Sequence, residues 1–153
     1  MYRKILVAYN GTPESRSALD EAAGLVPDAS VEVHLAGVVH YPSAYLLAGE
    51  YVPEVALADE REHMEADLKD AHARLAAKGL NVTEHLVVGE PVDVITKLVA
   101  ELNIDLLILG HSRSKSFAMR WWRGSVDAIL LERVRCSILV AADTGRPAGT
   151  RAA

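Results

Sequence analysis

Short continuous apolar runs alternate along the chain with longer segments whose apolar residues recur every three or four positions. The continuous runs cover residues 5–9, 31–39, 104–109 and 137–142, and a run with more polar residues covers 82–88. Uninterrupted apolar runs of this length are typical of strands covered on both faces, whereas mixed polar content favours an edge position. The pattern therefore predicts five strands, with 82–88 at an edge of the sheet.

The segments between these runs have the spacing of amphipathic helices. Thr12 and Pro13 fit an N-cap followed by proline at the first helical position, and Pro27 ends the helix that they begin. The longest periodic segment covers 57–75, and Gly79 suits a left-handed stop after it. Two further helices are expected, one from 90–91 and a shorter one from 124–125.

Strands and helices thus alternate from end to end, with no internal repeat and no linker. This order is typical of an α/β domain with a parallel sheet, helices on both faces and right-handed crossovers. The sequence predicts a single-domain, open, doubly wound five-stranded parallel sheet over residues 1–143. Residues 144–153 are small and polar, and we expect them to form a flexible C-terminal tail.

The composition excludes several classes of protein. Of the 153 residues, 50% are hydrophobic and 24% charged, which is typical of a globular chain. The net charge of −5 argues against a nucleic-acid binder, because attraction to phosphates needs a basic surface. No segment has the roughly 18 to 20 apolar residues that a membrane span needs. The single cysteine, Cys136, cannot form an internal disulfide, so we expect a cytoplasmic protein in which Cys136 is a small buried apolar residue.

Two strand ends carry groups suited to a ligand. Open parallel sheets bind ligands beyond the carboxyl ends of their strands, where the strand order reverses. One candidate is the turn from Ala8 to Thr12, which brings side-chain oxygens to the start of a helix. The other is Gly110 with the loop after it and Gly124-Ser125, where backbone N–H groups at a helix N-terminus favour phosphate.

The loop between these glycines is cationic although the protein is acidic. Residues 111–123 contain no carboxylate and four basic side chains: Arg113, Lys115, Arg120 and Arg123. Three interpretations stay open, namely a solvated loop, attraction of phosphate, and a partner surface that includes Trp121 and Trp122. The six histidines show no metal-ligand spacing on one helix face and are interpreted as surface or structural residues, although His111 lies at the candidate site. The charge-rich face of the long helix, over 59–70, is interpreted as a solvated face.

Taken together, these motifs resemble the universal stress protein family. The resemblance rests on the opening segment 4–12, on the glycine after the fourth strand and on Gly124-Ser125-Val126, and it extends over residues 2–142 in order and spacing. It implies the strand order 3-2-1-4-5 and homodimers that pair through the last strand. It also implies two branches, one that holds ATP in a G-x2-G-x9-G-[ST] loop and one that lacks this loop and does not bind ATP.

This sequence departs from the ATP-binding pattern at two places. Arg113 stands where the second glycine is expected, and one inserted residue makes the loop G-x3-S-x9-G-S, with Ser114 in the glycine position. Asn10 stands where that branch usually has aspartate. Carried over by position, the adenosine side comprises Ala8, Asn10, Val38, Leu109 and Gly110. The phosphate side comprises Ser114, Gly124, Ser125 and Val126.

Two functions therefore remain open. The first is a cytoplasmic stress-response module, a homodimer that binds ATP or another adenine nucleotide, with Mg²⁺, without rapid chemistry. The second is a dimeric interaction protein of the branch that does not bind ATP, with no cofactor and an unidentified protein partner. No nucleophile elbow, P-loop lysine or paired carboxylates are present, so an ATP-hydrolysing enzyme ranks last. Each site residue also has a plainer role, since Asn10 can cap its own turn and Gly124-Ser125 can simply begin a helix.

Overall fold

The computed structural model describes residues 1–40, 54–111 and 126–142. Its strands are β1 (Lys4–Ala8), β2 (Glu32–His40), β3 (Asn81–Gly89), β4 (Leu106–His111) and β5 (Ser137–Ala142). Its helices are α1 (Pro13–Leu25), α3 (Glu54–Ala76), α4 (Pro91–Leu102) and α5 (Val126–Arg133). The predicted elements are all present, with boundaries that differ by a few residues. The predicted tail, 144–153, lies outside the described residues.

All four strand pairs are parallel, and the sheet order is β3-β2-β1-β4-β5. The predicted fold class and strand order are therefore confirmed, and β3 occupies the predicted edge. β1 lies at the centre of the sheet, between β2 and β4. From β1 the chain adds β2 and β3 on one side and then β4 and β5 on the other, so the strand order reverses at β1. By the general rule for open α/β sheets, this places a ligand site beyond the carboxyl ends of β1 and its neighbours.

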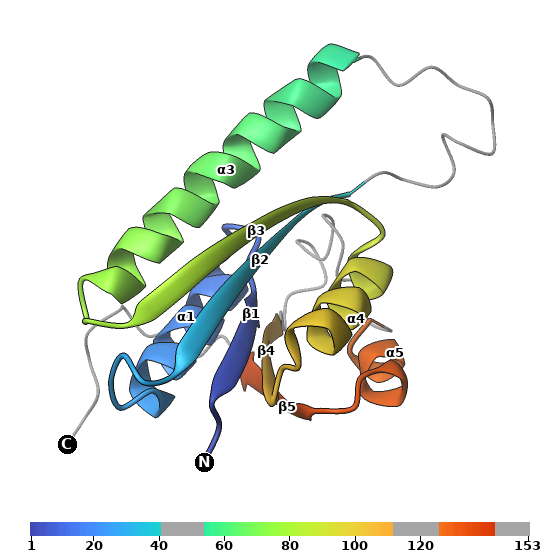
Figure 1. Cartoon of the computed structure of the whole chain (residues 1–153). Helices are drawn as coiled ribbons and strands as arrows, with labels where there is room; N and C mark the ends of the chain where they lie inside the picture. The colour runs from blue at the N-terminus through green and yellow to red at the C-terminus, as the bar shows by residue number, and fades with distance from the viewer. Residues whose placement is uncertain (41–53, 112–125, 143–153) are drawn as a thin grey trace.

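Helices cover both faces of the sheet (Figure 1). On one face, Leu19 of α1 and Leu68 and Leu75 of α3 pack against odd-numbered residues of β1 and β2. On the other face, Ile95 of α4 and Leu130 of α5 pack against even-numbered residues of the same strands. This alternation explains why the strands are continuous apolar runs, since both sides of each central strand are buried.

Local sequence determines where the helices begin and end. The Thr12 hydroxyl accepts a hydrogen bond from the N–H of Ser15 at 3.3 Å, and Pro13 follows at the first helical position, as predicted. Gly79 has a φ of +79°, which confirms the predicted left-handed stop after α3. Asn103 caps α4 with a φ of 54°, a conformation that asparagine tolerates better than most residues.

At the amino end of the sheet, one carboxylate joins two central strands. Asp105, just before β4, accepts hydrogen bonds from the backbone N–H of Arg3 at 2.9 Å and of Lys4 at 3.0 Å. These two hydrogen bonds lower the pKa of Asp105 below its ordinary value. No helix in the described part of the chain is long and apolar enough to cross a membrane.

Candidate functional site

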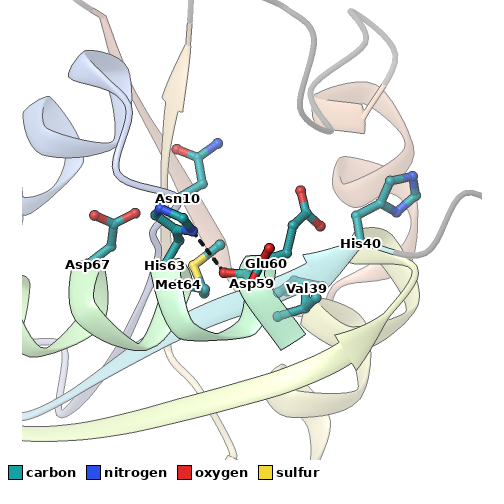
Figure 2. Close-up of a pocket in the computed structure, with 9 residues that line it drawn as sticks. Asn10, Val39, His40, Asp59, Glu60, His63, Met64 and Asp67 are labelled. Carbon is teal, nitrogen blue, oxygen red and sulfur yellow. Dashed lines mark hydrogen bonds between the residues drawn. The ribbon is translucent and has the colours of Figure 1, made fainter. Parts of the chain in front are cut away.

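A cavity of about 280 Å³ opens at the carboxyl ends of β1 and β2, beneath the first half of α3 (Figure 2). Three parts of the chain supply its walls: the turn after β1, the last residues of β2 and one face of α3. Its volume lies near the lower end of the range of ~300–1,000 Å³ that is typical of ligand pockets. The lining residues are Asn10, Val38, Val39, His40, Asp59, Glu60, His63, Met64 and Asp67.

Asn10 is held in one orientation by the turn that follows β1. Its Oδ1 accepts hydrogen bonds from the backbone N–H of Thr12 at 3.2 Å and from the Thr12 hydroxyl at 2.6 Å. Ser15 completes the turn, because its hydroxyl donates to the Thr12 carbonyl at 2.9 Å and accepts from the N–H of Asn10 at 3.4 Å. This confirms that Asn10 caps its own turn. With the amide oxygen occupied, Nδ2 is the group that Asn10 can offer to a ligand (Figure 2).

Gly11 allows α3 to approach this turn closely. Its φ is +76°, in the left-handed region that favours glycine. A Cβ at this position would overlap the carboxylate of Asp67. The glycine therefore serves both the turn and the position of the Asp67 carboxylate at the edge of the cavity.

Tyr9 lies beneath the same turn and is only 1% exposed. Burial raises the pKa of the Tyr9 phenol, a hydrogen bond with Arg16 opposes this rise, and the charges of Asp67 and Asp70 add to it. The phenol is therefore neutral at physiological pH. The Tyr9 side chain packs beneath the turn and does not line the cavity.

The α3 wall depends on a close contact between helix and sheet. A Cβ on Gly37 of β2 would stand 2.8 Å from Leu68 Cδ1 and 2.9 Å from Met64 Cγ, so the absence of a side chain there lets α3 approach β2. Within α3, His63 Nδ1 lies 2.8 Å from the carbonyl oxygen of Asp59. Because a carbonyl can only accept, Nδ1 carries the proton and Nε2 of the neutral ring is an acceptor. At the other wall, His40 Nδ1 lies 3.8 Å from Glu90 Oε2.

The residues predicted for the adenosine side occupy three different environments. Asn10 and Val38 line the cavity together. Ala8 and Leu109 are 1% and 0% exposed, within the core on the α4 side of the sheet. Gly110 lies against the first turn of α1, where a Cβ would overlap the carbonyl group of Glu14. Close helix packing therefore requires a glycine at 110 whether or not a ligand binds.

The residues predicted for the phosphate side are for the most part outside the described residues. This holds for Ser114, Gly124 and Ser125, and for the basic loop with Trp121 and Trp122. Val126 is the first residue of α5. His111 is exposed at the end of β4. Cys136 is half-buried beside the core on the α4 side, where burial raises the pKa of its thiol.

Sequence reasoning missed the α3 wall of the cavity. Most of the face over 59–70 is exposed, as predicted, and Asp59, Glu60 and Asp67 on it also line the cavity, which the sequence did not indicate. A signal was present in Gly37, because a glycine within a buried strand indicates that another element comes close. Among the described residues, no group of three or more His, Cys, Asp or Glu side chains is arranged to hold a metal ion.

Comparison with known proteins identifies relatives over nearly the full length of the chain. The model of the universal stress protein family matches residues 1–142. The universal stress protein YxiE of Bacillus subtilis is 27% identical over 92% of this chain and 99% of its own. A crystal structure from the same family in Burkholderia pseudomallei is 27% identical, covers 91% of this chain and 95% of its own, and has a TM-score of 0.70. A universal stress protein crystallised in complex with cAMP is 26% identical, covers 94% of this chain and 98% of its own, and has a TM-score of 0.65.

Proposed function

This chain belongs to the universal stress protein family, and on that premise we propose that it is a regulatory module that binds an adenine nucleotide at the carboxyl ends of β1 and β2. The observation that carries the proposal is the cavity that joins Asn10 and Val38 to one face of α3. The cavity lies beside the central strand, where the general rule for open α/β sheets expects a ligand.

The chemistry of the cavity suits the nucleoside part of a nucleotide. Met64 of α3 provides an apolar surface for a flat base, beside the end of β2 at Val38 and Val39. Asn10 Nδ2 offers a donor to a ring nitrogen or a sugar oxygen. The α3 carboxylates offer acceptors to hydroxyl and amino groups. A related protein has been crystallised with cAMP, an adenine nucleotide, and the likeness to it extends over 94% of this chain.

The phosphates would extend beyond the cavity, towards the segment that follows β4. That segment carries the degenerate loop with Gly110, Ser114 and Gly124-Ser125, together with Arg113. Backbone N–H groups and basic side chains of such a loop attract phosphate, with Mg²⁺ as an accompanying ion in the case of ATP. We propose a regulatory rather than a catalytic role in the cytoplasm, and we expect no ATP turnover above background.

Calorimetry with purified protein tests this proposal, after co-purified nucleotide has been removed and identified. We expect AMP or ATP to bind with a dissociation constant in the micromolar to millimolar range. His63→Trp fills the cavity from an exposed position and should weaken binding at least tenfold. Glu62→Trp adds the same ring to an exposed neighbour that does not line the cavity, and should leave binding unchanged. If neither nucleotide binds at millimolar concentration, the proposal is wrong.

The second candidate is a dimeric interaction protein that binds no nucleotide. It is favoured by Asn10 in place of aspartate and by the packing of Gly110 on Glu14, which accounts for this glycine without a phosphate. Under this alternative, His63→Trp would leave every property of the protein unchanged, including its binding of a protein partner. Pairing of two chains through β5 is proposed under both candidates.

A further inference from the structure

The α3 wall gives the cavity a strongly negative lining. Asp59, Glu60 and Asp67 contribute three carboxylates, and no lysine or arginine among the residues that the structure describes lines the cavity. Asp59 and Glu60 are exposed at the rim, whereas Asp67 is half-buried against Gly11. The negative electrostatic potential in the cavity therefore comes from the carboxylates on one face of α3, and a ligand bound in the cavity would lie next to them.

These carboxylates are not neutralised by ion pairs within residues 1–40, 54–111 and 126–142. The described ion pairs of α3 involve other residues, Lys69 with Glu65 and His72 with Glu84. Arg16, the one basic residue of α1, interacts with the Tyr9 phenol. His63 uses its Nδ1 proton on the Asp59 carbonyl and, when neutral, presents only an acceptor.

A wall of this kind distinguishes between parts of a nucleotide. Carboxylate oxygens and an unprotonated imidazole nitrogen accept hydrogen bonds from ribose hydroxyls or an exocyclic amine. A phosphate group has no such donors when it is ionised, and it repels carboxylates at close range. The opposite preference would be expected of a cavity lined by arginine or lysine.

Resting on the proposed function, we propose that Asp59, Glu60 and Asp67 are specificity determinants that make this site favour adenosine and AMP over ATP. Each added phosphate increases the negative charge that the α3 face must tolerate, and this repulsion acts against the attraction that the basic residues after β4 exert on phosphate. Screening by salt weakens repulsion between partly exposed charges, with a Debye length of about 10 Å at 0.1 M and about 30 Å at 0.01 M. The preference should therefore be largest at low ionic strength.

The test is calorimetry of the full chain with adenosine, AMP, ADP and ATP at pH 8, in EDTA, at low and high salt. EDTA keeps divalent ions from masking the phosphate charge. We expect AMP to bind about tenfold more tightly than ATP at low salt, with a smaller ratio at high salt.

The variant Asp59→Asn/Glu60→Gln should raise ATP affinity several-fold and reduce this ratio. Both side chains are exposed, so the fold should be retained. The control Asp20→Asn/Glu62→Gln makes the same change in net charge at exposed positions that do not line the cavity, and it should leave the ratio unchanged. ATP binding as tightly as AMP, or a ratio that the cavity variant and the control change equally, overturns this inference alone. Failure of all four ligands to bind overturns the proposed function as well.

Discussion

The imidazoles of His34 and His85 face each other across β2 and β3, with 2.9 Å between His34 Nδ1 and His85 Nε2. His34 is 7% exposed, and its Nε2 lies 3.5 Å from Glu32 Oε2. A hydrogen bond between two imidazole nitrogens needs one proton between them, so the pair cannot hold a proton on both facing nitrogens. The edge strand β3 is thus joined to β2 by a contact that depends on protonation.

This contact predicts that the protein loses stability in mild acid. Burial lowers the pKa of both imidazoles, and the proximity of His34 lowers that of His85 further. Unfolded histidines take up protons as the pH falls through about 6.5, and the folded pair resists them, so stability is complete above that pH and declines below it. The slope should approach ~1.4 kcal/mol per pH unit for each proton taken up on unfolding.

Denaturant unfolding at pH 8.0, 6.5 and 5.5 measures this decline. His34→Gln/His85→Gln should flatten the pH profile, whereas His63→Gln, at an exposed position, should leave it as in the parent protein. An unchanged profile in the double variant would exclude the pair as the source of acid sensitivity.

The close packing of Gly110 predicts that adding a single methyl group at this position strongly lowers the free energy of unfolding. Gly110→Ala places a Cβ into the backbone of Glu14, and backbone atoms of a helix cannot move aside cheaply. We expect a loss of roughly 2–4 kcal/mol in the free energy of unfolding. Gly79→Ala is the matched control, because it has a positive φ but open space around it, and it should cost about 1 kcal/mol. Equal costs for both variants would contradict this interpretation of Gly110.

The turn after β1 predicts that Thr12 stabilises both α1 and the Asn10 side chain. Thr12→Ala removes the N-cap of α1 and the 2.6 Å hydrogen bond to Asn10 Oδ1, so we expect a loss of about 1–2 kcal/mol and weaker nucleotide binding. Thr12→Ser should restore both properties. Ser17→Ala, which removes only an exposed hydrogen bond to the Pro13 carbonyl, should change stability by less than about 0.5 kcal/mol. Thermal unfolding and calorimetry together separate the two roles.

The position of β5 at an edge of the sheet, as the described residues show it, predicts self-association. Val140 is 44% exposed on an edge strand, and Leu131 of α5 is 63% exposed. A lysine on an edge strand opposes strand pairing. Val140→Lys should therefore convert a dimer into a monomer in light scattering at micromolar concentration. Leu25→Lys, at a similarly exposed position on α1, should remain a dimer, and a parent protein that is already monomeric would disprove the pairing.

The sequence predicts the framework of this protein well because its elements follow from local patterns. Continuous apolar runs mark the strands, and the Thr12-Pro13 and Gly79 signals mark helix ends that the structure confirms. The contact between His34 and His85 could not be predicted in this way, since it depends on the register of β2 with β3, which pairs Ala36 with His85. The acidic wall likewise depends on where α3 crosses the ends of β1 and β2, which the periodicity of its own sequence does not determine. The phosphate side of the site remains a prediction from the sequence.

The two hydrogen bonds that Asp105 accepts from Arg3 and Lys4 have a practical consequence for biophysical work. They attach the start of β1 at the amino end of the sheet. All five strands run in the same direction, and the cavity lies beyond the carboxyl ends of β1 and β2, so these hydrogen bonds lie at the end of the sheet opposite the cavity. Met1 precedes these hydrogen-bonded residues in the chain and is fully exposed. A tag or surface linker attached there would hold the molecule with the cavity turned towards the solution, which suits immobilised-protein binding assays.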